Sequence, residues 1–257
     1  MTVLDEIIVG VREDFQSRQL PLTQLIEMAD RTGAIRNPLS SLKSNALSVI
    51  AEVKRSSPSK GALATISDPA ALAFAYEKAG ASVVSVLTEG RKFGGSLSDL
   101  AAVKNNVSVP VLRKDFMVDE YQFFEARAYG ADLVLLIVAA LSQSQLCEFY
   151  ELTHDLGMQA VVEVHSRDEL ARALEINAHI IGVNSRNLKD LTIDYEVFAD
   201  LLPLIPQSKV RVAESGISTR ENVLFAQASG ANALLIGEAL VRGDDPGKTM
   251  RVLLGSE

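Results

Sequence analysis

The sequence is poor in residues that bind metals or form covalent cross-links. Its 257 residues include a single cysteine, Cys147, which excludes an intramolecular disulfide framework and a cysteine-rich zinc site. The three histidines, His154, His165 and His179, lack the spacing of metal ligands, and we interpret them as surface or helix-end residues. No uninterrupted run of about 18 apolar residues exists, so no membrane-spanning helix is predicted.

Positive charge is also in deficit. There are 25 lysines and arginines against 33 aspartates and glutamates, a formal net charge of -8. This balance argues against a dedicated nucleic-acid binder or a binder of anionic membranes, although a basic pocket can lie inside an acidic shell. The first residues carry Asp5, Glu6 and Glu13 among apolar ones, unlike a secretory signal. With 47% hydrophobic and 23% charged residues, we expect a compact, soluble, cytoplasmic α/β protein.

A weak internal repeat is the most informative pattern. Residues 80–86, 130–136 and 230–236 each begin with Gly-Ala and continue as an apolar run, and each follows an alanine-containing helical stretch. Glycine in this position fits the residue after a helix, and the apolar run fits a buried parallel strand. A degenerate copy over residues 177–183 begins with Asn177 instead of glycine.

The intervals between the repeats predict the architecture. Gly80 and Gly130 are 50 residues apart with another strand-like run, residues 109–114, between them, so one strand and its helix take about 25 residues. Residues 48–257 therefore hold about eight such units. Alternating strands and helices predict a parallel sheet with right-handed crossovers, and eight equal units favour a closed (β/α)₈ TIM barrel over an open doubly wound sheet.

Helix starts between the strands are well marked. Asp68-Pro69 supplies a capping side chain followed by a first-turn proline. Three further pairs match the capping-box pattern, in which a hydroxyl residue is followed three positions later by Glu or Gln: Ser142 with Gln145, Ser166 with Glu169, and Ser218 with Glu221.

Residues 1–47 differ from the repeats and predict an N-terminal helical extension packed on the barrel. Two apolar helical faces are expected there, formed by Leu4, Ile7, Ile8 and Val11, and by Leu22, Leu25, Ile26 and Ala29. No low-complexity linker separates this extension from residues 48–257. We therefore expect a single domain over residues 1–257.

Charged residues occur where the predicted strands end. In residues 48–54, period-two alternation directs Glu52 and Lys54 to one face, which should be the barrel mouth because the helix-facing side must be apolar. Among the neighbours Arg113 and Lys114, the alternation leaves Lys114 pointing inward. Six ionisable groups are thus expected to share one mouth: Glu52, Lys54, Lys114, Glu163, Arg186 and Glu214. A single such residue is readily explained as a structural ion pair, but six together indicate acid–base chemistry.

A phosphate site is predicted beside this cluster. TIM barrels often bind phosphate with the loops after strands 7 and 8, which here carry Ser215-Gly216 and Gly237-Glu238. Glycines there could equally serve tight turns alone. The segment from Arg55 to about residue 67 is rich in hydroxyl groups and cations; it is predicted either to cover the substrate or to be a mobile surface loop without a role. Phe93 is a candidate apolar wall, and no P-loop or dinucleotide-binding glycine pattern is found.

Residues 50–59, Ile-Ala-Glu-Val-Lys-Arg-Ser-Ser-Pro-Ser, resemble the signature of the indole-3-glycerol phosphate synthase family. The resemblance continues through residues 87–89, 112–116, 162–165, 184–188, 213–217 and 236–238. It implies a carboxy-lyase of tryptophan biosynthesis, free of metal and organic cofactor, that converts 1-(2-carboxyphenylamino)-1-deoxyribulose 5-phosphate to indole-3-glycerol phosphate, CO₂ and water. The sequence departs from some relatives at Glu238, where they have Ser or Thr.

The resemblance also implies roles for individual residues. Lys114 would be the general acid, Lys54 would hold the substrate carboxylate and could also act as an acid, and Glu163 would be the base, with a pKa that burial should raise. Glu52 and Asn184 would assist departure of the hydroxyl group. Further residues would bind or orient the substrate: Arg186, Glu214, Phe93, Ser57, Ser215, Gly216, Gly237 and Glu238.

Two other functions remain open at the level of sequence. A Schiff-base aldolase or isomerase of a phosphorylated sugar could use Lys114 or Lys54 as nucleophile, and a non-enzymatic barrel could bind phosphate without turnover. In each case the expected partner is a small phosphorylated molecule, with no nucleic acid or membrane. We expect a monomer or a weak homo-oligomer.

Overall fold

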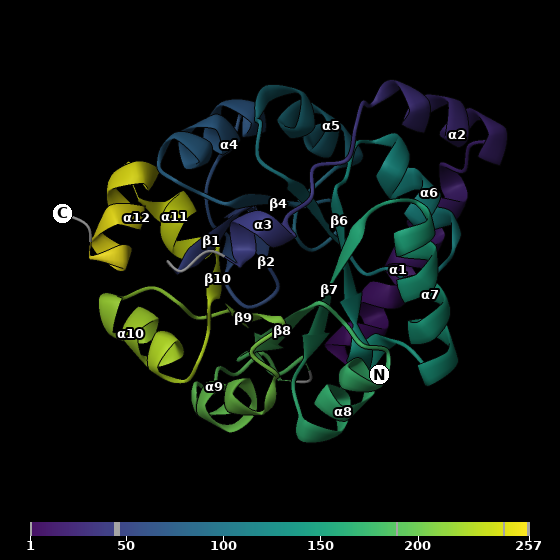
Figure 1. Cartoon of the computed structure of the whole chain (residues 1–257). Helices are drawn as coiled ribbons and strands as arrows, with labels where there is room; N and C mark the ends of the chain where they lie inside the picture. Colours follow the sequence, from purple (N-terminus) through teal and green to yellow (C-terminus); the bar gives the residue numbers. More distant parts are fainter. Residues whose placement is uncertain (1, 44–46, 189, 244, 256–257) are drawn as a thin grey trace.

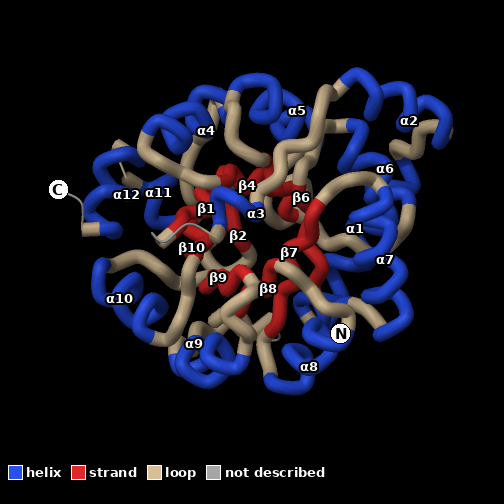
Figure 2. Tube along the Cα trace, viewed as in Figure 1, coloured by secondary structure: helices blue, strands red, loops and turns tan. Residues whose placement is uncertain are grey.

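The fold is a closed barrel of parallel strands surrounded by helices, seen along its axis in Figures 1 and 2. The structure, a computed structural model, describes residues 2–43, 47–188, 190–243 and 245–255. Within these residues eight strands pair in the order β1-β10-β9-β8-β7-β6-β5-β4, and β4 pairs with β1 to close the ring. The predicted TIM barrel is confirmed, and the open sheet is excluded. The barrel strands are β1 (Ser48–Val53), β4 (Val83–Leu87), β5 (Val111–Lys114), β6 (Leu133–Ile137), β7 (Gln159–Val164), β8 (Ile180–Asn184), β9 (Val210–Glu214) and β10 (Ala233–Ile236).

The helices follow the strands as the repeat predicts. Around the barrel lie α4 (Pro69–Lys78), α5 (Leu97–Asn106), α6 (Tyr121–Ala128), α7 (Gln143–Asp155), α8 (Arg167–Glu175), α9 (Glu196–Leu201), α10 (Arg220–Ala228), α11 (Glu238–Arg242) and α12 (Pro246–Leu254), with short 3₁₀ turns at η1 (Val138–Ala140) and η2 (Leu202–Leu204). The segment after β1 forms a small antiparallel ribbon of β2 (Ser56–Ser57) and β3 (Gly61–Ala62). No helix within the described residues combines the length and apolarity needed to cross a bilayer.

The first residue of each repeat adopts the left-handed conformation that the pattern requires. The φ angles of Gly80, Gly130 and Gly230 are 99°, 89° and 108°, and that of Asn177 is 55°. Glycine adopts such angles without strain, and asparagine is among the residues that tolerate them best. Each helix can therefore end abruptly and the chain can turn directly into a buried strand.

Two of the predicted helix starts form as expected. Asp68 caps α4 by accepting a hydrogen bond from the backbone of Ala71 at 2.9 Å. Ser142 and Gln145 form the complete capping box of α7. Both caps satisfy backbone N–H groups that have no partner inside their helix.

The other two predicted boxes differ in detail. Ser166 caps α8, but the carboxylate of Glu169 accepts from the backbone of His165 instead of closing the box on Ser166. The box assigned to Ser218 and Glu221 is wrong, because α10 is capped one residue later by Thr219, which pairs reciprocally with Asn222. The amide oxygen of Asn222 accepts from the backbone of Thr219 and so performs the task expected of a glutamate.

The N-terminal extension contacts the barrel at both ends and along one side. Helix α1 (Val3–Ser17) buries Leu4, Ile7, Val11 and Phe15, whereas Ile8 is half-buried. Helix α3 (Leu39–Leu42) lies in front of the ring of strands in Figure 1. It is anchored to the start of β1 by a hydrogen bond of 2.9 Å from the Ser48 hydroxyl to the carbonyl of Ser41.

Helix α2 (Leu22–Arg31) corrects the predicted apolar face. It lies beside α6 at the periphery of the molecule (Figure 1). Leu25 is completely buried there, but Leu22 and Ile26 are each 48% exposed. A peripheral helix that packs mainly against one other helix buries only a narrow stripe, so part of the face expected to pack on the barrel is exposed to water.

A buried ionic network ties the extension to β5. Arg113 points away from the barrel mouth, is fully buried, and donates to Asp115 at 3.0 Å and to Glu125 on α6 at 2.9 Å. Glu125 accepts two further hydrogen bonds, of 2.9 and 3.0 Å, from Arg18 at the end of α1. The network therefore holds α1, α6 and the strand that carries Lys114 together.

Substituting Glu125→Gln should lower the free energy of unfolding by about 3–5 kcal/mol, because it leaves the buried guanidinium of Arg113 with too little compensating charge. Urea unfolding followed by circular dichroism measures the change. Glu120→Gln is the matched control, because Glu120 is exposed and should change the value by less than about 0.5 kcal/mol. Equal effects of the two substitutions would contradict the importance of the network.

Candidate active site

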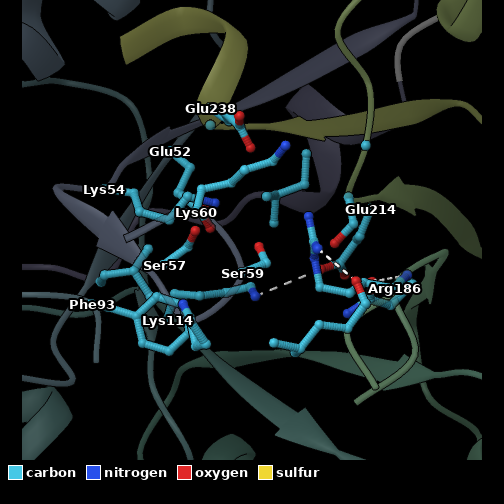
Figure 3. A pocket seen from close by; sticks show the side chains of 18 of the residues that line it. Glu52, Lys54, Ser57, Ser59, Lys60, Phe93, Lys114, Arg186, Glu214 and Glu238 are labelled. Carbon is cyan, nitrogen blue, oxygen red and sulfur yellow. Dashed lines mark hydrogen bonds and ion pairs between the residues drawn. The ribbon is translucent and has the colours of Figure 1, made fainter. Parts of the chain in front are cut away.

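A cavity of about 500 Å³ opens at the carboxyl ends of the barrel strands (Figure 3). Helix α1 contributes Leu4 and Ile7 to its rim, and the ribbon after β1 contributes Ser57, Ser59 and Lys60. The sequence-predicted site residues come from seven strands and their loops, and all of them line this cavity: Glu52, Lys54, Ser57, Phe93, Lys114, Glu163, Asn184, Arg186, Glu214, Ser215, Gly216, Gly237 and Glu238.

Strand β1 supplies an ion pair to the cavity. Glu52 lies in the strand and Lys54 directly follows it; their side chains lie together, as alternation predicts, with Lys54 Nζ 2.6 Å from Glu52 Oε1. Gly237, directly after the neighbouring strand β10, leaves room for the Glu52 side chain, because a Cβ atom at this position would lie 2.5 Å from Glu52 Oε1. A carboxylate and an ammonium group are thus fixed side by side at the edge of the cavity.

Lys114 lies at the centre of the charged cluster and extends into the cavity toward Glu214 (Figure 3). Its Nζ atom is 3.6 Å from Glu163 Oε2 and 3.8 Å from Glu214 Oε2. Burial alone would lower the pKa of Lys114, but the negative charges of Glu163, Glu214 and Glu52 raise it above its ordinary value. The side chain is therefore an ammonium ion that can donate a proton and hold an anion.

The two carboxylates beside Lys114 have opposite electrostatic environments. Burial alone would raise the pKa of Glu163, but the nearby charges of Lys114 and His165 and a hydrogen bond with Asn184 bring it below its ordinary value. The expectation of a raised pKa for Glu163 is therefore wrong, because the neighbouring charges outweigh the effect of burial. Burial and the negative charge of Glu163 instead raise the pKa of Glu214 well above its ordinary value. Of the two carboxyl groups, Glu163 is therefore the one that ionises more readily.

Close packing holds Glu214 in this position. Gly182 on the adjacent strand β8 leaves the space that the carboxylate occupies, since a Cβ atom on Gly182 would collide with Glu214 Oε1. Neither carboxylate oxygen of Glu214 has a hydrogen-bond partner among the described residues. The charge of a buried carboxylate is costly, and its compensation comes from Lys114, whose Nζ atom lies 3.8 Å from Glu214 Oε2.

The turn after β9 is shaped to present its backbone to the cavity. Ser215 and Gly216 are consecutive residues with φ angles of 70° and 72°. The carbonyl of Gly216 accepts a 2.7 Å hydrogen bond from Tyr195 Oη. A Cβ atom on Gly216 would lie 2.9 Å from Tyr195 Oη, so a larger residue would crowd the tyrosine. Elsewhere in the cavity, the hydroxyl of Ser57 is buried and has no partner among the described residues.

Arg186 and Phe93 form two further sides of the cavity. The guanidinium of Arg186 donates to the carbonyl of Leu191 at 2.9 Å, and its backbone N–H donates to Asn184 Oδ1 at 2.9 Å. Phe93 lies against Phe116, with ring centroids 6.1 Å apart. A cationic side and an aromatic side therefore flank the charged centre.

His165 is a site residue that sequence reasoning missed. It lies next to a helix end, directly before the cap of α8, but its Nε2 atom also lies 3.4 Å from Glu163 Oε1. The signal was its position two residues after Glu163, which places both side chains on the same face of the chain. Lys60 was also not singled out, although it lines the cavity (Figure 3).

The closed barrel and its mouth define a TIM-barrel enzyme with acid–base groups at the carboxyl ends of its strands. Residues 4–253 match the family of indole-3-glycerol phosphate synthase. The chain belongs to this family, and like its relatives it is a carboxy-lyase of tryptophan biosynthesis that acts on a phosphorylated small molecule.

Individual relatives agree with this assignment. The indole-3-glycerol phosphate synthase of Kineococcus radiotolerans is 56% identical over 263 residues, covering 100% of this chain and 96% of the relative. That of Paenarthrobacter aurescens is 54% identical over 96% of this chain and 93% of its own. Both alignments span the barrel and the N-terminal extension.

Solved structures of more distant proteins share the fold. A 3-hexulose-6-phosphate synthase superposes with a TM-score of 0.61 at 17% identity, covering 81% of this chain and 99% of that one. A thiamine phosphate pyrophosphorylase from Pyrococcus furiosus gives 0.60 at 14% identity, with 83% and 95% covered. At these identities the similarity concerns the barrel alone.

Proposed function

We propose that the mouth cavity converts 1-(2-carboxyphenylamino)-1-deoxyribulose 5-phosphate to indole-3-glycerol phosphate with side chains alone. The observation that carries this proposal is the placement of an ammonium group, Lys114, 3.6 Å from a carboxylate, Glu163, that stays ionised although it is buried. One group can give a proton and the other can take one within the same cavity.

The substrate's two anionic ends have separate binding groups. We assign its phosphate to Ser57, Ser215, Gly216, Gly237 and Glu238, because β1, β10 and β9 are neighbours in the barrel and the segments after them line the same cavity, where the Ser57 hydroxyl has no partner among the described residues. The carboxylate attached to the aromatic ring is assigned to Lys54, with Arg186 nearby and Phe93 against the ring. When the substrate binds, the ion pair between Lys54 and Glu52 weakens and Lys54 forms a new ion pair with the substrate carboxylate.

Ring closure and loss of CO₂ come first. Lys114 protonates the ketone oxygen as the ring carbon bearing the carboxylate attacks the ketone carbon, so a carbon–carbon bond forms and the ketone becomes a hydroxyl group. Glu214, 3.8 Å from Lys114 Nζ, supports the ammonium group. The iminium ion formed by closure then accepts the electrons of the breaking C–CO₂ bond, so this step needs neither a metal nor an organic cofactor.

Dehydration completes the indole. Glu163 takes a proton from the ring carbon next to nitrogen while the hydroxyl group leaves as water, and the ring becomes aromatic. Glu52 and Asn184 hydrogen-bond to the departing hydroxyl group. Lys54 can donate the proton that this group needs to leave as water. Lys114, Glu163, Glu52 and Lys54 thereby each have a task at a defined group of the substrate.

The charge of Lys114 argues against the Schiff-base alternative. A nucleophilic lysine must be neutral, whereas three carboxylates raise the pKa of Lys114. We further propose that residues 1–257 fold as one domain and work in the cytoplasm as a monomer or weak homo-oligomer, because one chain supplies every residue assigned to the cavity.

The test is to supply 1-(2-carboxyphenylamino)-1-deoxyribulose 5-phosphate and record indole fluorescence. We expect the signal to rise in metal-free buffer containing a chelator, and borohydride added during turnover to trap no substrate on the protein. Absence of the indole signal would contradict the assigned reaction. A borohydride-trapped adduct on Lys114 or Lys54 would favour the Schiff-base mechanism instead.

A further inference from the structure

Two hydroxyl groups hold the turn after β9. Ser185 Oγ donates to the carbonyl of Ser215 at 3.1 Å, and Tyr195 Oη donates to the carbonyl of Gly216 at 2.7 Å. Both residues of the turn with positive φ angles therefore have their carbonyl oxygens bound by side chains from outside β9. Neither hydroxyl has a task in the proposed reaction.

Both hydroxyl donors come from the segment that follows β8. Ser185 lies directly after that strand, and Tyr195 lies directly before α9. The backbone N–H of Asp194 donates to the carbonyl of Ser185 at 2.9 Å, and Arg186 pairs with Ile193 in an antiparallel bridge. The segment is therefore folded back on itself, and both of its ends contact the turn after β9.

The turn adopts a conformation that needs such support. Ser215 has a φ angle of 70°, which is unfavourable for a residue other than glycine and persists where the surroundings stabilise it. The side chain of Tyr195 also lies close to the backbone of the turn, because a Cβ atom on Gly216 would lie 3.0 Å from Tyr195 Cε1. The two hydroxyl groups thus favour one conformation of the turn.

The hydrogen bond from Ser185 determines where the next N–H group points. All described peptide bonds are trans, and in a trans peptide the C=O and N–H groups point in opposite directions. The carbonyl of Ser215 is directed at Ser185, so the N–H of Gly216 points away from the segment after β8. The strand on the other side of β9 is β10, which is followed by Gly237.

The same reasoning applies to the next peptide. Tyr195 holds the carbonyl of Gly216, so the N–H of Ile217 points away from the tyrosine hydroxyl. Neither the N–H of Gly216 nor that of Ile217 donates to another described residue, and both residues line the mouth cavity. Successive backbone N–H groups in a turn of this kind form a concavity that binds anions.

We propose that Ser185 and Tyr195 are positioning residues for the substrate phosphate. Their hydroxyl groups hold the turn so that the N–H groups of Gly216 and Ile217 are directed at the phosphate before it binds, which lowers the cost of ordering these donors. This inference rests on the proposed assignment of the phosphate to the turn after β9. It adds two residues that act on the phosphate through the backbone.

The first test measures Tyr195→Phe and Ser185→Ala, each of which removes one hydroxyl group. We expect KM for 1-(2-carboxyphenylamino)-1-deoxyribulose 5-phosphate to rise about three- to tenfold in each variant, the usual effect of one hydrogen bond. The value of kcat should change by less than about twofold, because no group at the reacting atoms is altered. The inhibition constant of inorganic phosphate, measured in competition with the substrate, should rise by the same factor as KM.

Tyr129→Phe and Ser229→Ala are the matched controls. Both residues are half-buried and line neither of the two cavities found among the described residues. The Ser229 hydroxyl donates to the carbonyl of Phe225 at 2.8 Å, so its removal deletes the same kind of hydrogen bond as in Ser185→Ala. Both controls should keep the KM and the phosphate inhibition constant of the unaltered protein.

An inhibitor without a phosphate separates positioning from a general loosening of the cavity. We expect 1-(2-carboxyphenylamino)-1-deoxyribulose, the substrate without its phosphate, to inhibit Tyr195→Phe and the unaltered protein with equal inhibition constants. Its inhibition constant should stay unchanged in Ser185→Ala as well. A rise as large as that for inorganic phosphate would overturn the proposal, because the hydroxyl groups would then support the whole cavity.

Unchanged phosphate binding in both Tyr195→Phe and Ser185→Ala would also overturn the proposal. Titration calorimetry with inorganic phosphate measures this binding without turnover, so the result does not depend on the assigned reaction. Ordinary phosphate binding by both variants, beside indole formation by the unaltered protein, removes only the positioning role. Absence of indole formation removes the proposed function, while weaker phosphate binding in the two variants would still support the positioning role.

Discussion

Substituting Lys114→Ala is expected to lower kcat by about 10²–10⁴-fold, the usual contribution of one positioned acid. The ketone oxygen then lacks the only ammonium group that lies against both buried carboxylates, Glu163 and Glu214, within the described residues. Steady-state assays of indole formation, with circular dichroism to confirm folding, measure the effect. We expect Lys114→Arg to fold more stably than Lys114→Ala but to remain slow, because guanidinium keeps the charge and is a much weaker acid.

Lys78→Ala is the matched control for this experiment. Lys78 is an exposed residue near the end of α4, so its removal should leave kcat unchanged. Ordinary turnover by Lys114→Ala would remove the general acid from the mechanism. Equal losses in the two variants would show that the effect of Lys114 is not specific to the site.

Substituting Glu163→Gln is expected to lower kcat by a similar factor, about 10²–10⁴-fold, because the amide cannot take the proton lost in dehydration. In the unaltered protein, kcat should fall on acidification only as pH drops through the lowered pKa of Glu163. The base should thus stay active below the range in which an ordinary glutamate becomes protonated. A series of kcat measurements across acidic pH, with Glu148→Gln at an exposed position of α7 as control, tests both statements.

A different pH profile would locate the error. If the acidic limb of the unaltered protein lies above the ordinary glutamate range, Glu163 is not held ionised by Lys114 and His165. If Glu163→Gln turns over normally, another group removes the proton. A normal Glu148→Gln beside a slow Glu163→Gln would confirm that the loss belongs to the active site.

The barrel could be predicted because its signal is local and repeated. Gly80, Gly130 and Gly230 mark the same turn in successive units, and their positive φ angles are dictated by a helix that must stop and enter a buried strand. The positions of Glu52, Lys54 and Lys114 followed from strand alternation, since a closed barrel places its inward-facing strand ends around one mouth. These inferences needed only neighbours along the chain.

The electrostatics of the site could not be predicted in the same way. Burial alone suggested a raised pKa for Glu163, but its ionisation depends on Lys114 and His165. Lys114 arrives from a different strand, so no local pattern shows that it contacts Glu163. The raised pKa of Glu214 likewise depends on burial and on the carboxylate of Glu163, which comes from β7, the strand on the other side of β8. A pKa is set by distances between residues that are remote in sequence.

The extension shows a similar limit. The apolar residues of α2 predicted a packed face, yet Leu22 and Ile26 are half exposed while Leu25 is buried. Amphipathic periodicity identifies which residues share a side of a helix. It does not determine how wide a contact the rest of the chain offers to that side, which here comes mainly from the neighbouring helix α6.

The most direct measurement is a crystal structure of the protein with indole-3-glycerol phosphate bound. We expect the phosphate between Ser57 and the turns at Ser215-Gly216 and Gly237-Glu238, with the indole ring within hydrogen-bonding reach of Lys114 and Glu163. A product molecule whose phosphate binds elsewhere, or whose ring lies beyond reach of both side chains, would contradict the assignment of acid and base.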